Sequence, residues 1–141
     1  MLHFQLVSVR GSKYDDEAYE ILVPTPAGTV GIFEDHMPLI SAAAPGVLSV
    51  RRKQSDSDDA MDHFAVNGGI VEVDGKTVRF IADDVSAPDE ISEQEAAQAL
   101  ARAEKLVAEA DSQTALHEAH RRLNHSSARL QVSRLKRRHH N

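Results

Sequence analysis

The sequence predicts an all-β sandwich followed by an antiparallel hairpin of two α-helices. Apolar residues alternate with a period of two in the first part of the chain and change to a helical period after a capping signal at Ser92. The charge changes at the same place: residues 1–91 carry 7 basic and 16 acidic side chains, whereas residues 92–141 carry 9 basic and 6 acidic ones. We therefore expect two units, residues 1–88 and residues 89–141, with different electrostatic partners.

Short strands separated by turn signals make up the first unit. Alternation predicts two half-buried strands, and short apolar runs between Gly, Pro, Asn or Asp predict three more. The predicted strands lie at residues 2–6, 19–23, 30–33, 47–50 and 64–66. In residues 71–80, Asp74-Gly75 between β-branched flanks predicts a hairpin with a type I′ turn, and Gly68-Gly69 predicts a tight turn between strands. Strands in such a series favour a sandwich or a barrel.

The second unit begins with a helix signal. Ser92 and Glu95 have the spacing of a capping box, and apolar residues then recur every three or four positions, with an interruption at residues 111–114. Two such helices joined by a short loop form an antiparallel hairpin. The first stripe is mostly Ala, with Leu100 and Val107 as its large members, each contributing about 1.5–3 kcal/mol when fully buried. We therefore expect a hairpin that packs on another surface and detaches at modest cost.

Composition excludes several classes of function. The chain has no Cys, which removes disulfides, thiolate catalysis and cysteine metal sites. The charge-free stretches at residues 21–33 and 37–50 are shorter than the roughly 20 apolar residues of a membrane helix, so we expect no membrane insertion. The first residues lack the pattern of a signal or transit peptide, and we expect an intracellular protein. The Ser/Asp-rich residues 53–62 predict a solvated loop.

The sequence gives little support for a catalytic site or for a nucleic-acid-binding site. Asp35, His36 and His63 could supply ligands for metal-assisted hydrolysis, but isolated clusters of this kind are usually loop residues. The basic end of the chain could contact phosphates, but the rest of the chain is acidic and offers no aromatic platform, so we expect no nucleic-acid partner. Two interpretations of the basic helix stay open: a solvated face, or a surface for an acidic protein.

Three features in order resemble the epsilon subunit of F-type ATP synthases, of the bacterial type. Residues 28–40 are similar to the family's pattern Gly-x-x-Gly-Ile-x-x-x-His-x-Pro-Leu. Residues 64–73 and 78–83 resemble its Gly-Gly-x-x-Glu-Val and Ala-Asp segments. A strand-rich N-terminal part is followed by a helical hairpin with Arg-Leu-x-Val at residues 129–132. The resemblance covers nearly the whole chain.

The resemblance implies a non-catalytic rotor subunit of the central stalk. In the family, the sandwich binds the gamma subunit and sits on the ring of c subunits, which helps to couple proton-driven rotation to ATP synthesis. The ring-facing loop would contain Gly28, Thr29, Gly31, Glu34, Asp35, His36 and Pro38. The hairpin resembles an inhibitory arm that contacts the beta subunits of the alpha/beta catalytic head, here through Arg121, Arg122, Arg129 and Arg134. The protein would then lie at the cytoplasmic face of the bacterial cell membrane, as a peripheral component.

The sequence departs from the family in its pattern for ATP binding. Members that bind ATP on the folded hairpin carry Ile/Leu-Asp-x-x-Arg-Ala, but Ser92 stands here at the Asp position and Glu95 at the Arg position. His125 falls where a further Arg often appears. Because a carboxylate repels phosphate, we expect weak or no ATP binding and no cofactor. The alternative function is an unrelated β-sandwich adaptor whose basic hairpin binds an acidic protein.

Overall fold

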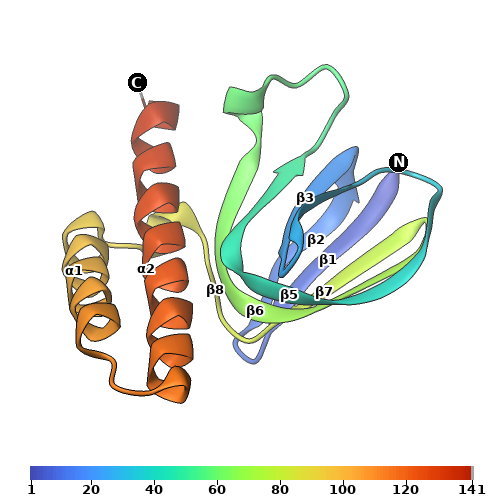
Figure 1. Ribbon diagram of the computed structural model, residues 1–141. Coiled ribbons are helices and arrows are strands. Elements are labelled where there is room, and N and C mark those ends of the chain that lie inside the picture. The colour runs from blue at the N-terminus through green and yellow to red at the C-terminus, as the bar shows by residue number, and fades with distance from the viewer. Residues whose placement is uncertain (141) are drawn as a thin grey trace.

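The computed structural model describes residues 1–140, with side chains to residue 135, as a β-sandwich and a helical hairpin beside it (Figure 1). The described residues form eight strands: β1 (Leu2–Ser8), β2 (Gly11–Ala18), β3 (Glu20–Thr25), β4 (Gly28–Ile32), β5 (His36–Arg51), β6 (Asp62–Gly75), β7 (Thr77–Ala82) and β8 (Val85–Ser86). They are followed by α1 (Glu93–Glu109) and α2 (Gln113–His140). The predicted order, a β-sandwich and then two helices, is confirmed.

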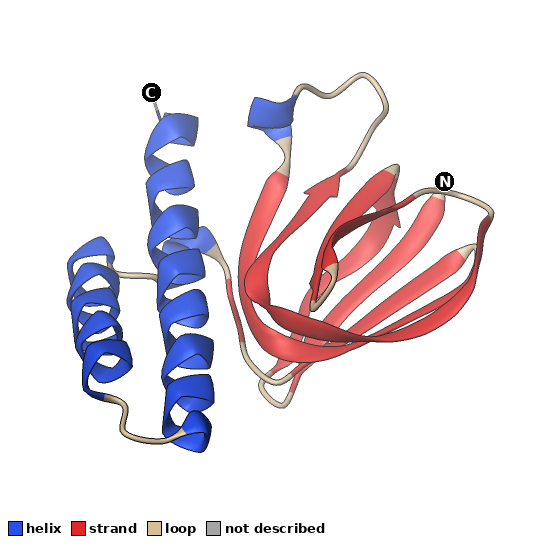
Figure 2. Cartoon of the chain, viewed as in Figure 1, coloured by secondary structure: helices blue, strands red, loops and turns tan. Residues whose placement is uncertain are grey.

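One curved sheet forms both layers of the sandwich (Figure 2). Its strand order is β2-β1-β7-β6-β5-β3-β4, with β8 paired to β6, and the strand pairs of the described residues are antiparallel except β1 with β7. The long strands β5 and β6 pair along most of their length and curve through the sandwich. These two strands therefore connect surfaces at opposite ends of the molecule.

The core confirms the predicted alternation. Leu2, Phe4 and Leu6 of β1 are fully buried, as are Val78 and Phe80 of β7, while the residues between them are less buried. Because successive side chains of a strand point to opposite faces, this pattern places one face of each strand in the core. The core has few aromatic rings and is built mainly from Val, Leu and Ile.

Two turn predictions were wrong. Gly68 and Gly69 lie inside β6, where a Cβ on Gly69 would come within 2.2 Å of the Ile81 carbonyl oxygen of β7. The β6–β7 turn is also shifted by one residue: Asp74 pairs with Thr77, so the turn residues are Gly75 and Lys76. Gly75 has φ +60°, and the Lys76 amide donates to the Asp74 carbonyl at 2.6 Å, which is a γ-turn instead of type I′.

The sequence did not reveal β2 as a strand. Its residues Gly11–Ala18 are largely polar, and only Tyr14 and Ala18 are buried. β2 is an edge strand, and the charges at Asp15, Asp16 and Glu17 suit an edge that faces solvent, because charged side chains discourage pairing with another chain. Alternation of apolar and polar residues cannot be recognised in β2, because even its inner face has only two apolar residues.

The hairpin packs on the sandwich with α2 between α1 and the sheet (Figure 1). As predicted, Ser92 caps α1, since its Oγ accepts from the Glu95 amide at 3.3 Å. A second core joins the hairpin to β6, and its buried members are Ala65, Ile91, Ala96, Ala128, Leu130 and Val132. The sequence predicted a single apolar stripe along α2. In the structure α2 also has buried residues that share a cluster with Ala65 of the sheet, among them Ala128 and Val132.

Replacing Gly69 by Ala should destabilise the sandwich more than any replacement in a free turn. The added Cβ would overlap a backbone atom of β7, and φ is +138°. We expect the free energy of unfolding to fall by about 4 kcal/mol or more, measured by urea denaturation. Gly75→Ala is the matched control: φ is +60° and nothing lies within 4 Å, so the loss should be about 1–2 kcal/mol. Equal losses in the two variants would contradict this account.

Candidate interaction surfaces

Residues 28–38 do not form the single loop that the sequence predicted. Gly28, Thr29 and Gly31 belong to edge strand β4, and His36 and Pro38 open β5, so only residues 33–35 form a turn. Gly28 and Thr29 stand at the start of β4, whereas the turn follows its other end. The structure therefore brings Glu34, Asp35 and His36 together and separates Gly28 and Thr29 from them.

The turn at residues 33–35 has a fixed backbone and an acidic, exposed surface. Asp35 has φ +63°, the one positive φ of a non-glycine residue in the described chain, and Asp tolerates this region better than most residues. Its amide donates to the Gly75 carbonyl at 3.2 Å, and the His36 amide donates to the Phe33 carbonyl at 3.2 Å. The turn is thereby attached to the β6–β7 turn.

Glu34 keeps its negative charge at this turn. Its carboxylate lies 2.8 Å from the amino group of Met1, and this hydrogen bond and charge lower the pKa of Glu34. Met37, two residues beyond Asp35, is 79% exposed. The turn therefore presents exposed carboxylates, and an exposed apolar side chain follows two residues later, at the end of the sandwich away from the helices (Figure 1).

An apolar surface covers the outer side of β5, β6 and β7. Ile40, Ile70 and Ile81 are 76%, 48% and 42% exposed. Ala42 pairs with Ile70 and Ile70 with Ile81, so these side chains share one face, and Ile40 lies two residues from Ala42 on that face. We call Ile40, Ala42, Ile70 and Ile81 the outer apolar face. Exposed apolar patches of this kind mark interaction sites.

The outer apolar face was not predicted, although the sequence contains a signal for it. Ile40 follows Leu39, Ile70 precedes Val71, and Ile81 follows Phe80, so apolar residues stand on both faces of the same strands. Strands that are covered on both sides show such continuous runs. The inner members Val71 and Phe80 are buried in the core. The outer members have no cover within the described chain.

The predicted metal ligands lie apart. His36 is at the start of β5, paired with Gly75, whereas His63 pairs with Ser49 near the other end of β5. His63 Nδ1 is 2.8 Å from Ser49 Oγ. Among the described residues no group of three His, Cys, Asp or Glu side chains could hold a metal ion. The metal-assisted hydrolysis considered from the sequence therefore has no site in the described chain.

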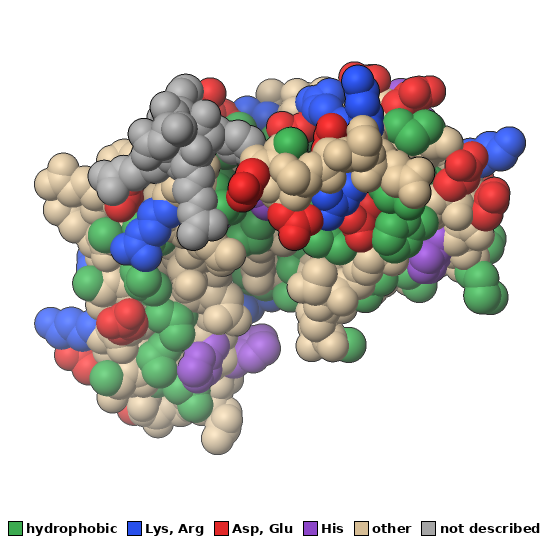
Figure 3. Space-filling view, turned by 90° about the horizontal axis from the view of Figure 1, so that it is seen from above, with side chains coloured by type: hydrophobic (Ala, Val, Ile, Leu, Met, Phe, Trp, Pro, Cys, Tyr) green, Lys and Arg blue, Asp and Glu red, His purple; other side chains and the backbone are tan. Residues whose placement is uncertain are grey.

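Charged side chains fix the loop at residues 53–62. Arg51 donates to Glu20 at 3.0 Å, to Asp58 at 2.6 Å and to the Asp56 carbonyl at 2.6 Å, and its pKa is raised by the hydrogen bonds to Asp58 and Glu20. A short 3₁₀ turn, Asp58–Ala60, interrupts the loop. Figure 3, which looks down on this end, shows acidic and basic side chains interspersed there. The predicted loop is solvated but anchored.

The four predicted arm arginines do not form one basic face. Arg121 and Arg129 are half-buried, and Arg121 Nη2 lies 3.5 Å from the place that a Cβ on Gly68 of β6 would occupy. Arg122 is exposed and paired with Glu118 at 3.4 Å, and Arg134 is exposed and paired with Glu93 at 3.7 Å. In this docked arrangement, two of the four guanidinium groups are partly covered.

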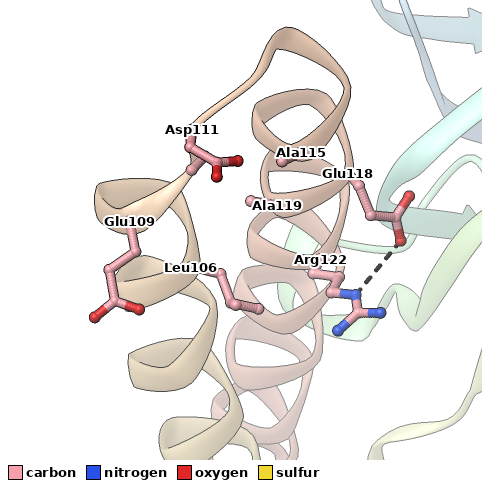
Figure 4. A pocket seen from close by; sticks show the side chains of 8 residues that line it. Leu106, Glu109, Asp111, Ala115, Glu118, Ala119 and Arg122 are labelled. Carbon is pink, nitrogen blue, oxygen red and sulfur yellow. Dashed lines mark hydrogen bonds and ion pairs between the residues drawn. The ribbon is translucent and has the colours of Figure 1, made fainter.

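An open pocket of about 380 Å³ lies between the two helices near the loop that joins them, and Figure 4 shows the Arg122–Glu118 ion pair at its edge. Its lining consists of Leu106, Glu109, Ala110, Asp111, Ala115, Glu118, Ala119 and Arg122. Ala115 and Ala119 line the α2 side of this pocket (Figure 4).

Comparison with known proteins supports a common origin for the sandwich. Residues 1–88 match the family model described as ATP synthase, Delta/Epsilon chain, beta-sandwich domain. A chain in the cryo-EM structure of the Euglena gracilis mitochondrial ATP synthase (OSCP, F1 and c-ring, rotational state 1) has a TM-score of 0.74 at 19% identity, covering 90% of this chain and 78% of that one. A chain of the Tetrahymena thermophila mitochondrial ATP synthase central stalk and c-ring has a TM-score of 0.63 at 17% identity, covering 94% and 96%.

The structural matches show a shared fold, and the family model shows ancestry. Its match spans more than half of the chain and includes every strand of the sandwich. No helix among the described residues is long and apolar enough to cross a membrane. The chain belongs to the ATP synthase delta/epsilon family, whose beta-sandwich domain it carries at residues 1–88.

Proposed function

We propose that this protein is an epsilon-type, non-catalytic subunit of a bacterial F-type ATP synthase. Its sandwich, residues 1–88, binds the gamma subunit and faces the c-ring, and its hairpin, residues 89–141, is an arm that restrains ATP hydrolysis. The single observation that carries this proposal is the outer apolar face on the family's own domain. The alternative of an unrelated adaptor is not favoured, since the sandwich itself matches the family.

The outer apolar face suits the gamma subunit. Ile40, Ile70 and Ile81 come from three neighbouring strands, so their relative positions are fixed by the sheet. Beside them, Arg79 of β7 pairs in register with Glu72 of β6 and supplies charge at the edge. An apolar centre with a charged border is the usual composition of a stable protein interface. A rotor subunit needs such a contact because it must turn with the shaft.

The turn at residues 33–35 suits the c-ring. Glu34 and Asp35 offer two carboxylates on a backbone fixed to the β6–β7 turn, which favours contact with basic loops of a partner. His36 and Pro38 at the start of β5 adjoin them, and Gly31 precedes them on β4. Gly28 and Thr29, at the other end of β4, are the weaker part of this assignment. The matched Euglena and Tetrahymena structures contain c-rings.

The hairpin has the features expected of a regulatory arm. Half of the buried residues in the cluster that joins it to the sandwich are alanines, Ala65, Ala96 and Ala128, and an alanine side chain contributes only one methyl group of apolar surface. Release from the sandwich would uncover Arg121 and Arg129 and add them to the exposed Arg122. Arg134 would join them once its pair with Glu93 opens. These guanidinium groups would then meet an acidic segment of the catalytic head. The assembly would place the protein peripherally, at the cytoplasmic face of the membrane.

Replacing Ile40 by Asp should weaken binding to a gamma-containing complex by about tenfold or more, because the change removes the most exposed isoleucine of the outer apolar face and places a second carboxylate opposite Glu72. Calorimetry or a pull-down series measures the affinity. Ala101→Asp is the control, since Ala101 is exposed on α1, which packs on α2 and lies outside the outer apolar face. Unchanged binding by Ile40→Asp, or an equal loss in the control, would refute the assignment of this face.

Removing residues 92–141 should leave assembly with gamma intact and raise ATP hydrolysis by the complex. In the full-length chain, Arg122→Glu should act in the same direction, and its effect should shrink as salt is raised, because exposed charges are screened beyond about 10 Å at 0.1 M ionic strength. Lys105→Glu, on the exposed side of α1, is the control and should leave hydrolysis unchanged. If the truncated protein assembles and hydrolysis stays the same, the arm has no inhibitory role.

A further inference from the structure

His125 occupies the contact between the hairpin and the sandwich. It lies on α2 between Arg121, whose guanidinium reaches Gly68 of β6, and Ala128, which packs in the same buried cluster as Ala65 of β6. The imidazole is half-buried, and its Nε2 atom is fully buried with no hydrogen-bond partner among the described residues. A buried, unpaired ring nitrogen is costly, and it costs more when the ring carries a charge.

The charged groups around His125 come from both elements. Asp84, which follows β7, faces the imidazole from the sandwich and favours its protonated form. Arg129, one turn further along α2, disfavours that form. Burial is the largest influence, and with Arg129 it lowers the pKa of His125 despite Asp84. Asp83 and Arg121 adjoin the same place, beside Gly68.

We propose that His125 makes the docking of the hairpin on the sandwich sensitive to protons, so that acidification releases the hairpin. The docked state holds His125 neutral, and the released state exposes it to water, where it takes up a proton near pH 6.5. The released state therefore binds more protons than the docked one. Docking is strongest above pH 6.5 and weakens as the pH falls below it, until the docked form also titrates.

The proposal has a functional consequence that rests on the proposed function. If the hairpin is an inhibitory arm, then acidification increases the fraction of chains whose arm is free to reach the catalytic head. The docking equilibrium itself lies within one chain and requires neither gamma nor the c-ring. A failure of the stalk assignment would therefore leave the docking proposal standing, and a failure of the docking proposal would leave the stalk assignment standing.

The test follows docking in the isolated full-length chain. Because the chain has no Cys, Val9→Cys and Gln113→Cys supply two exposed labelling positions, one on the sandwich and one at the start of α2. Single-molecule energy transfer between dyes at these positions counts docked and released molecules from pH 8 to pH 5. We expect the docked-to-released ratio to fall by up to about tenfold per pH unit below pH 6.5, which is the limit for one proton.

Three variants identify the group responsible. His125→Gln, which is neutral at every pH, should keep the hairpin docked across the range, while His117→Gln, on the exposed side of the same helix, should behave like the unmodified chain. Asp84→Asn should increase the total loss of docking at pH 5, since Asp84 is the group that favours the charged ring. A pH-independent ratio in the unmodified chain, an unchanged response in His125→Gln, or a smaller loss in Asp84→Asn would overturn the proposal.

The unmodified chain decides the question even if His125→Gln does not fold. Circular dichroism of the sheet, recorded alongside the energy transfer, separates release of the hairpin from unfolding of the sandwich. Release at a pH where the sheet signal is unchanged supports the proposal. Release that coincides with loss of the sheet overturns it.

Discussion

Small side chains hold the helical hairpin against the sandwich, and the behaviour proposed for this protein depends on that contact. The buried cluster at this contact contains three alanines, Ala65, Ala96 and Ala128, beside Ile91, Leu130 and Val132. Each alanine contributes little more than one methyl group, worth about 0.8 kcal/mol. The sandwich core, by contrast, buries Phe4 and Phe80 completely. The hairpin should therefore separate from the sheet at a much lower cost than the sheet itself unfolds.

Strands β5 and β6 connect the two surfaces of the molecule. Toward one end of this pair lie Ile40 and Ile70 of the outer apolar face, and toward the other lie Val47 and Ala65, which contact the hairpin. Twelve residue pairs, from His36 with Gly75 to Val50 with Asp62, join the strands over this distance. A sheet paired this extensively is rigid. The docking surface for the hairpin is thereby held at a fixed position relative to the surface proposed for gamma.

The sequence predicted the order and type of the elements because their signals are local. Alternation in β1, the cap at Ser92 and the change of period after it depend on neighbouring residues alone. The edge strand β2 was not predicted, because its exposed face and much of its inner face are polar and the strand therefore shows no alternation of apolar and polar residues. The turn at Gly75 was displaced by one residue because the pairing of Asp74 with Thr77 is decided by the register of whole strands.

The candidate surfaces were only partly predictable, since they depend on which residues come together in space. Glu34 and Asp35 were identified from a motif, and the structure places them side by side in one exposed turn. The contact of four arginines with the catalytic head stays a prediction, and their separation in the docked hairpin could not be foreseen, because Arg121 reaches the sandwich while Arg134 pairs with α1. The buried Nε2 of His125 appears only when α2 is placed against the sheet. Sequence periodicity contains no information about that docking.

Hydrogen exchange by mass spectrometry, on the chain alone and bound to gamma, tests most directly whether a stable sandwich carries a lightly held hairpin. The account predicts that amides of α1 and α2 exchange much faster than those of β1, β6 and β7 in the free chain. It also predicts that gamma slows exchange around Ile40, Ile70 and Ile81. Equal protection of helices and sheet, with no change at these three isoleucines on binding, would contradict the account.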